Sequence, residues 1–304
     1  MEADDQNGIV ENQHDAAGQL TGRFRGQVPL EEYRYDDVGN LYPRGQARTY
    51  GPGGRLEQVD RTTYVYDERA RLIEKTTIGD DGDERRWTYS WNGKGLLHAV
   101  VTPDGARTEF VYDCFARRVS KRSFGGDGRL EKTTRFVWDG DHVVHEIVVT
   151  EATGAREVHT HCFGDDEIEI LASRVQGGGV AEGWRSFVTA PNGFPDLVFG
   201  ADGAIVARGE RDAWGRTTTE PAELGPFRYA GQYADTETGL YYNRHRYYDP
   251  SIGRYINADP IETARSLRLF AYVDNDPYRW IDPDGLAYAE VTNHGITGRG
   301  YSKT

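Results

Sequence analysis

A short motif recurs through the first half of the chain and limits the fold more than any other feature. Each copy has two aromatic residues separated by one other residue, then Asp or Asn, two variable residues and usually a small residue. The Asp or Asn residues fall at positions 36, 67, 92, 113 and 139, so the steps are 31, 25, 21 and 26 residues. Such uneven steps are typical of repeated hairpins rather than of a solenoid. The copies are Tyr33-Arg-Tyr35-Asp36, Tyr64-Val-Tyr66-Asp67, Tyr89-Ser-Trp91-Asn92, Phe110-Val-Tyr112-Asp113 and Phe136-Val-Trp138-Asp139, with a worn copy at Asp212-Ala-Trp-Gly215-Arg216.

The chemistry of one unit predicts a β-hairpin. Aromatic residues at positions i and i+2 of a strand point to the same face. The Asp that follows accepts hydrogen bonds from the backbone of a turn, and a Gly or Ala three residues later tolerates the reversal. Neighbouring hairpins must then pair to bury their aromatic faces. We therefore expect an all-β fold in which neighbouring hairpins pair into an antiparallel sheet.

Composition agrees with this prediction and excludes several functions. The chain of 304 residues has 19 Tyr, 37 Gly and one Met, so it favours many turns and half-buried aromatic surfaces over one thick core. Its length allows either one large all-β domain or two smaller ones. A formal net charge of −13 argues against binding nucleic acid or an anionic membrane. No apolar run approaches the roughly 20 residues that a spanning helix needs, so membrane insertion is not expected.

Residues 1–30 differ from the repeats. They are acidic, lack periodicity and contain no Lys or Arg before Arg23, which predicts a disordered leader. No secretory signal is visible in the opening MEADDQNG, so any export requires a carrier. The repeats occupy residues 31–225. Within them Gln176-Gly-Gly-Gly179 is either a flexible break or a long hairpin loop, and 261–273 is an irregular or short-helical segment.

The segment 226–286 contains the most distinctive sequence. It includes GQYADTETGLYYNRHRYYDPSIGRYINADP and, further on, DPDGL. Together with the preceding units, this block resembles the Rhs (YD-repeat) family, whose repeats also occur in the C subunits of Tc toxin complexes and in the teneurin shell. The resemblance extends over roughly Tyr33 to Leu286, and it is strongest over the last sixty residues.

The resemblance implies a β-shell that encloses a toxic C-terminal domain, and a core terminus that acts as an intramolecular aspartyl protease. Such proteins cut after the Leu of Asp-Pro-x-Gly-Leu, and two elements of this type have eighteen residues between them. Here Asp259-Pro-Ile-Glu-Thr263 and Asp282-Pro-Asp-Gly-Leu286 flank residues 264–281, which is the same spacing. The chain departs from the family pattern at Glu262 and Thr263, where Gly and Leu are usual, and has Arg265 and Arg268 in the intervening segment.

Asp259 and Asp282 are therefore the candidate catalytic pair. Peptide hydrolysis by two carboxyls needs one ionised group to activate water and one protonated group, and close carboxyls share a proton. The bond to be cut joins Leu286 to Ala287, four residues beyond Asp282, so tethering supplies proximity. Arg254 and Asp276 are supporting candidates, and Asp249, Asp274 and Asp276 are possible substitutes for one member of the pair.

A structural interpretation of the same residues remains open. Asp282-Pro283-Asp-Gly285 suits a type I turn, and Asp249-Pro, Asp259-Pro and Asp276-Pro are equally good turn formers. Arg254 fits a surface ion pair as well as an oxyanion contact.

Other chemistry is weaker. His159-Thr-His161-Cys162 lacks a second ligand pair at zinc-site spacing, and His142 and His145 point to opposite faces of a strand. We expect neither a metal nor a cofactor. The two cysteines, Cys114 and Cys162, do not make a disulfide framework.

Five or six hairpins form a curved, open sheet rather than an enclosure, which predicts a partial shell with exposed strand edges. We expect partners such as another Rhs shell segment, a secretion-system carrier or an immunity protein, with export by a secretion apparatus or toxin complex and a role in bacterial competition. Residues 287–304 are too short to fold as an independent toxin. The alternatives are a noncatalytic structural or interaction module and, less favoured, a carbohydrate-binding surface protein.

Overall fold

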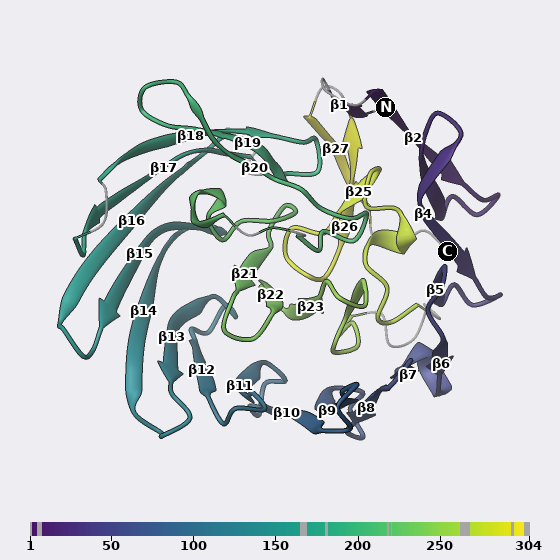
Figure 1. Ribbon diagram of the computed structural model, residues 1–304, viewed down its shortest axis with the longest axis horizontal. Helices are drawn as coiled ribbons and strands as arrows, with labels where there is room; N and C mark the ends of the chain where they lie inside the picture. The colour runs from purple at the N-terminus through teal and green to yellow at the C-terminus, as the bar shows by residue number, and fades with distance from the viewer. Residues whose placement is uncertain are drawn as a thin grey trace.

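The computed structural model describes residues 2–4, 8–164, 169–179, 182–217, 219, 221–261, 268–292 and 295–300. These residues form four antiparallel sheets. The largest curves around the strands of residues 233–255, and the N-terminal sheet lies on the opposite side of those strands (Figure 1). The largest sheet has fifteen strands in unbroken sequence order, from β6 at one edge to β20 at the other. No described helix is long and apolar enough to cross a membrane. The predicted curved, open antiparallel sheet is confirmed.

The strands of the large sheet are mostly joined by short hairpin turns. Their bounds are β6 Arg48–Tyr50, β7 Leu56–Val59, β8 Thr62–Tyr66, β9 Leu72–Ile78, β10 Glu84–Trp91, β11 Leu97–Val101, β12 Arg107–Tyr112, β13 Arg118–Phe124, β14 Leu130–Asp139, β15 His142–Thr150, β16 Ala155–Phe163, β17 Ile170–Gly177, β18 Gly183–Thr189, β19 Pro195–Phe199 and β20 Ile205–Arg208.

Three smaller sheets complete the fold. The N-terminal sheet contains β1 Glu2–Asp4, β2 Gly8–His14, β3 Leu20–Arg25, β4 Val28–Tyr35 and β5 Leu41–Pro43. The inner sheet contains β21 Tyr233–Asp235, β22 Leu240–Asn243, β23 Arg246–Asp249 and β24 Arg254–Tyr255. The last contains β25 Trp280–Ile281, β26 Tyr288–Thr292 and β27 Gly295–Gly300. Short 3-10 turns lie at η1 Pro52–Gly54, η2 Ala222–Leu224 and η3 Val273–Asn275.

The repeat motif forms the turn that its chemistry predicts. In five copies the acidic or amide oxygen of the motif accepts the backbone N–H groups two and four residues later. The donors are Val38 and Asn40 to Asp36, Arg69 and Arg71 to Asp67, Lys94 and Leu96 to Asn92, Phe115 and Arg117 to Asp113, and Trp214 and Arg216 to Asp212. The small residue three positions after the cap has positive φ in each case, including Ala70 at 57° and Ala116 at 62°. The worn copy at Asp212 is therefore a genuine unit.

The second aromatic residue of several units fastens one hairpin to the hairpin before it. Its side chain donates a hydrogen bond to a backbone carbonyl 15 to 20 residues earlier in the chain, in each case on the return strand of the preceding unit. The pairs are Tyr35 to Leu20, Trp91 to Leu72, Tyr112 to Leu97 and Trp138 to Arg118. Each of these hydrogen bonds satisfies the polar group of an aromatic side chain that is otherwise largely buried. The repeat therefore specifies how neighbouring hairpins pack as well as how each one turns.

Two expectations about individual segments need correction or completion. Residues 8–30 are not disordered in the structure, because β2, β3 and the start of β4 pair with one another and Leu20 is fully buried. The prediction of disorder was wrong because a strand that pairs with a neighbour on each side can be ordered by backbone hydrogen bonds with few apolar residues. Gln176–Gly179 leads out of β17, which pairs antiparallel with β18, so the hairpin alternative is the correct one. Residues 262–267 of the segment 261–273 lie outside the described residues, and η3 begins at Val273.

The inner sheet packs against the concave face of the large sheet (Figure 1). Its contact centres on Arg118 of β13, which is 1 % exposed. The guanidinium lies over four aromatic rings at 4.4–5.2 Å, and its Nη1 is 2.5 Å from Oδ2 of Asp235 in β21. Nζ of Lys121 lies 3.0 Å from Oδ1 of Asp235. Two cationic side chains of β13, Arg118 and Lys121, therefore neutralise Asp235.

Replacing Arg118 by Met should destabilise the fold strongly. The change leaves Asp235 with one cation in a desolvated site and removes the contact with the rings of Phe110, Phe136, Tyr233 and Tyr242, so we expect a loss of about 3–5 kcal/mol in the free energy of unfolding. Urea denaturation measures it. The matched control is Arg122→Met on the same strand, whose exposed pair with Glu109 should contribute no more than about 1 kcal/mol. Equal losses in the two variants would contradict this account.

Candidate active site

The fold brings Asp259 and Asp282 to the same guanidinium group. Nη1 of Arg246 lies 3.2 Å from Oδ2 of Asp259, and Nη2 lies 2.6 Å from Oδ2 of Asp282. The third nitrogen, Nε, donates to the carbonyl oxygen of Gly285 at 2.6 Å. All three side chains are buried, with Asp259 at 4 % and Asp282 at 2 % exposure. One Arg from β23 thus joins both carboxylates to the segment that precedes Leu286.

Asp282 also serves its own turn. Its Oδ1 accepts the N–H groups of Gly285 at 2.9 Å and Leu286 at 3.1 Å. Its Oδ2 accepts the hydroxyl of Tyr255 at 2.7 Å, next to the bond from Arg246. The turn-forming interpretation and the clustering with Asp259 are therefore both true of this residue. Asp259 likewise accepts the N–H of Ile261 at 2.8 Å through Oδ1.

Burial of the Asp282 carboxyl opposes its ionisation. Burial raises the pKa of the Asp282 carboxyl, and the opposing effects of Arg246 and of the Tyr255 hydroxyl do not cancel it. The guanidinium of Arg246 lies 3.7 Å from the ring centre of Tyr255, which closes one side of the group to solvent. A carboxyl with a raised pKa that shares a guanidinium with a second carboxyl is compatible with acid–base hydrolysis.

The turn 282–286 is clamped against the β22–β23 hairpin. Nδ2 of Asn243 donates to the carbonyl of Asp282 at 2.9 Å and to the hydroxyl of Tyr255 at 2.7 Å. Gly285 has φ +74°, and a Cβ there would clash with the carbonyl oxygen of Asn243. The turn therefore has little freedom to move away from the carboxylates.

The bond between Leu286 and Ala287 lies just beyond this clamp and is half-buried on both sides. Oδ1 of Asp284 accepts the N–H of Leu286 at 3.1 Å and that of Ala287 at 3.4 Å. The chain then enters β26, which pairs with β25 through Ile281–Ala289 and Trp280–Glu290. The segment after the candidate scissile bond is consequently held by a strand on the other side of the same turn.

The remaining candidates from the sequence lie in other contacts. Arg254 is buried rather than at the surface; it donates to Asn40 and Gly54 and lies over the ring of Tyr50. Neither the surface ion pair nor a contact with the carboxyl pair is seen for it among the described residues.

The three possible substitutes for one member of the pair, Asp249, Asp274 and Asp276, contact residues other than Arg246. Asp249 caps Ser251 and contacts Lys75, and Asp276 caps Tyr278 and contacts His14. Asp274 accepts the hydroxyl of Tyr288.

His161 of the weak metal motif contacts a carboxylate. Its Nε2 is 2.9 Å from Oε1 of Glu146, and Tyr233 donates to Oε2 of Glu146 at 2.6 Å. Burial alone would raise the pKa of Glu146, but the hydrogen bond and charge of His161, followed by the Tyr233 hydroxyl, lower the pKa to about 2. This group links β15 and β16 to the inner sheet, and we assign it a structural role.

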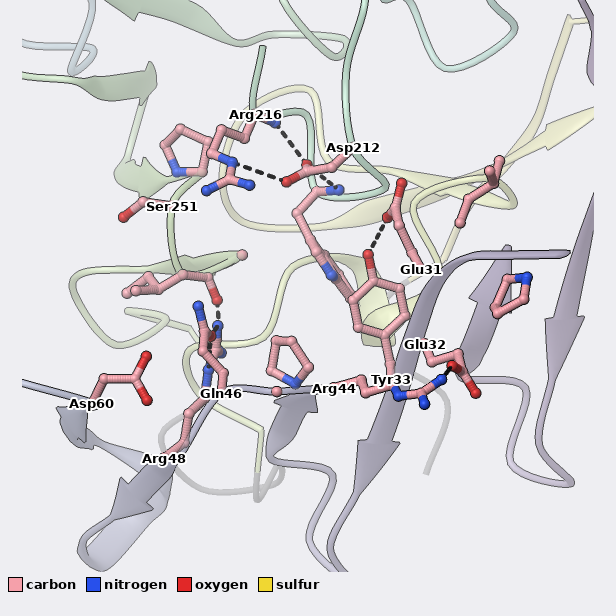
Figure 2. Close-up of a pocket in the computed structure, with 18 residues that line it drawn as sticks. Glu31, Glu32, Tyr33, Arg44, Gln46, Arg48, Asp60, Asp212, Arg216 and Ser251 are labelled. Carbon is pink, nitrogen blue, oxygen red and sulfur yellow. Dashed lines mark hydrogen bonds and ion pairs between the residues drawn. The ribbon is translucent and has the colours of Figure 1, made fainter. Parts of the chain in front are cut away.

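A pocket of about 540 Å³ lies away from these residues, where the N-terminal sheet meets the Asp212 turn and the 250–253 turn (Figure 2). Its charged side chains are largely paired with one another. Nε of Arg216 lies 3.2 Å from Oδ2 of Asp212, and Glu31 accepts the hydroxyl of Tyr33 (Figure 2). Glu31 also accepts the N–H of Ala213. Burial, and then the nearby Glu31 carboxylate, raise the pKa of Asp212 to about 6. This pocket is a junction rather than a catalytic centre.

Asp212→Asn should stabilise the protein at pH 7.5 and not at pH 4. Because the folded-state pKa exceeds the ordinary value of 3.8, folding is disfavoured as pH rises from about 4 through 6, where the buried group must ionise. Asn keeps the cap oxygen, as Asn92 does in its own unit. We expect a gain on the order of 1–2 kcal/mol at pH 7.5, measured by urea denaturation at both pH values. A loss at pH 7.5 would contradict the assignment.

Comparison with known proteins places the chain in a family. The family described as the teneurin YD-shell matches residues 1–278. The chain is 34 % identical over 317 residues to the probable deoxyribonuclease RhsA of Dickeya dadantii, covering 95 % of this chain and 21 % of that protein. It is 33 % identical over 314 residues to the double-stranded DNA deaminase toxin A of Burkholderia cenocepacia, covering 94 % and 21 %.

Solved structures confirm the fold. The crystal structure titled TcdB2-TccC3-TEV and the Photorhabdus luminescens Tc holotoxin pore each have a TM-score of 0.55 at 18 % identity, covering 92 % of this chain and 18 % of theirs. The chain thus belongs to the Rhs/YD-shell family, and it spans about a fifth of the length of the curated relatives that it matches.

Sequence reasoning missed several residues of this site. Arg246, Tyr255 and Asn243 all contact Asp282, and Asp284 contacts the N–H of Ala287. The sequence does contain a relevant pattern, because every residue from Tyr241 to Asp249 has a polar group in its side chain. In the structure most of these residues are buried. A buried strand of Tyr, Asn and Arg indicates a polar network, although it does not tell which partners complete it.

Proposed function

We propose that this chain is part of the β-shell of a toxin-delivery protein and that its core terminus cuts the bond between Leu286 and Ala287. The observation that carries the proposal is the shared contact of Asp259 and Asp282 with Arg246, whose Nε also holds the carbonyl of Gly285. A turn-forming role alone does not require the two acids to converge on one buried cation. The proposed units are the repeats at 31–225, the core terminus at 226–286 and the segment 287–304.

The proposed chemistry uses the two carboxyls in different states. Asp259 takes a proton from water, whose oxygen forms a bond to the carbonyl carbon of Leu286. Asp282, which burial keeps protonated more readily, supplies a proton to the nitrogen of Ala287 as the C–N bond breaks. The products are a carboxyl on Leu286 and an amine on Ala287. Arg246 fixes the positions of both acids, so little reorganisation accompanies the reaction.

The shell role rests on the relatives and on the curvature of the large sheet. Relatives of this chain are named as toxins and nucleases, and the chain covers only about a fifth of their length. We therefore propose that the sheet continues in further shell strands, and that the partners are another shell segment, a secretion carrier or an immunity protein. The exposed edge strand β20 offers unpaired backbone groups for such a continuation.

A noncatalytic scaffold is the second candidate, because Asp282 caps its own turn through Gly285 and Leu286. In that case the carboxyl pair and Arg246 would only fasten the end of the chain to the inner sheet. Mass measurement separates the two functions.

Asp259→Asn and Asp282→Asn should each block cleavage. Asn keeps the Oδ1 acceptor of each turn but neither gains nor releases the proton, so the cleaved fraction at a fixed time should fall at least about 100-fold. The 304-residue chain is made by cell-free synthesis, denatured at timed intervals and weighed by intact-mass spectrometry. Denaturation is needed because β26 pairs with β25 and would retain the cut segment. Wild type should lose residues 287–304.

The control is Asp276→Asn, a buried acid before Pro that caps Tyr278 and has no contact with Arg246 among the described residues. This variant should be cut at the wild-type rate. A wild-type chain that keeps its full mass, or Asn variants that are cut normally, would eliminate the aspartyl mechanism and leave the scaffold.

A further inference from the structure

A cavity of about 250 Å³ lies on the interior side of the Leu286–Ala287 bond. Both residues line it, together with Ile261, which is two residues after Asp259, and Pro283, which directly follows Asp282. The remaining wall is largely aromatic and comes from the large sheet and the inner sheet, including Phe163 and Phe227. The peptide to be cut therefore borders a mostly apolar cavity that neither Asp259 nor Asp282 lines.

Gln232 is the anomaly in this wall. It is 1 % exposed, it lines the cavity, and neither its Nε2 nor its Oε1 has a hydrogen-bond partner among the described residues. Its backbone is well fixed, since the N–H donates to Tyr229 at 2.8 Å and the carbonyl accepts from Arg228 at 3.1 Å. A buried amide that makes no bond is rare in a native fold and indicates a partner that forms at another stage.

The turn that carries Gln232 is packed directly on the turn that carries the scissile bond. A Cβ on Gly231 would clash with the carbonyl oxygen and Cα of Pro283, so only Gly allows this approach. Ala230 packs with Ile281 and Ala289, which lie on either side of the 282–287 segment. The turn that contains Gln232 is therefore packed tightly against the segment to be cut.

The carbonyl of Leu286 is the partner that hydrolysis would create. No hydrogen bond to this oxygen joins the described residues, whereas the neighbouring carbonyl of Gly285 is held by Arg246. When water adds to the carbonyl carbon, negative charge develops on this oxygen, and an amide N–H is a suitable donor to it. Apo enzymes often hold such donors slightly out of bonding distance.

We propose that Gln232 is a catalytic residue whose Nε2 donates a hydrogen bond to the Leu286 oxygen as it becomes charged. This inference rests on the proposed self-cleavage and assigns a third participant to it. Water oxygen bonds to the Leu286 carbon, its proton goes to Asp259, and the charged oxygen is held by Gln232. The C–N bond then breaks as the carbonyl re-forms, and the Ala287 nitrogen receives the proton of Asp282.

The test compares Gln232→Glu with Gln232→Leu at pH 5 and pH 8 by the same timed mass measurement. Glu has the shape of Gln but donates only when protonated, so its cleavage should be about 100-fold below wild type at pH 8 and recover at pH 5 relative to wild type. Leu should be about 100-fold slow at both pH values. Gln58→Glu, an exposed residue on β7, should cleave like wild type. Thermal melting of each variant reports folding.

The outcomes are distinct. If wild type is cut and a folded Gln232→Leu is cut equally fast, Gln232 is not a donor and only this inference fails. If Gln232→Glu is slow without recovery at low pH, the role of Gln232 is structural and the inference also fails. If Gln232→Leu has a lower melting temperature than wild type, the test depends only on how much faster Gln232→Glu is cut at pH 5 than at pH 8, each relative to wild type. If wild type itself is never cut, the self-cleavage proposal fails and takes this inference with it.

Discussion

The buried contact between Arg118 and Asp235 is the constraint on which the rest of the structure depends. It joins the middle of the large sheet to the first strand of the inner sheet, and the two side chains lie 2.5 Å apart. Aromatic rings from both sheets surround the guanidinium, so the ion pair is desolvated and its geometry is fixed. Other contacts, such as the hydrogen bond of Tyr233 to Glu146, also join the two sheets, but this ion pair is the most deeply buried charged contact between them.

Arg246 repeats the same device at the candidate active site. In both places a guanidinium lies against Tyr and neutralises acids that hairpins far apart in sequence bring together. The planar fork of Arg suits this use, because it bonds to several oxygens at once and is less strongly hydrated than Lys. Buried ion pairs of this kind add little net stability compared with apolar packing, but breaking one is costly. They therefore favour one arrangement over the alternatives.

The candidate site combines rigidity with buried polar groups that lack a partner. The 282–286 turn is held by Asn243, Arg246 and its own Asp282, and Gly231 packs on its other side. The side-chain amide of Gln232 and Oδ1 of Asn243 are both buried without a hydrogen-bond partner among the described residues. A single-turnover reaction on a tethered substrate needs only such modest preparation.

Local chemistry made much of the fold predictable. Asp67 and Asp113 cap their turns as the motif indicates, and even the degenerate copy at Asp212 does so. These bonds span four residues or fewer, so the sequence contains both partners. The N-terminal strands were not predictable in this way, because β2 and β3 are polar and are specified by pairing rather than by apolar periodicity.

For the candidate site, the sequence indicated Asp259 and Asp282 but assigned the supporting role to Arg254, which contacts Asn40 and Gly54 instead. The spacing of motifs along the chain determines which turns form and which acids they carry. Only the tertiary structure decides that Arg246 contacts both acids and that Gln232 lines the same cavity as Leu286 and Ala287. Such contacts join residues tens of positions apart, and they depend on how hairpins dock, which no local pattern specifies.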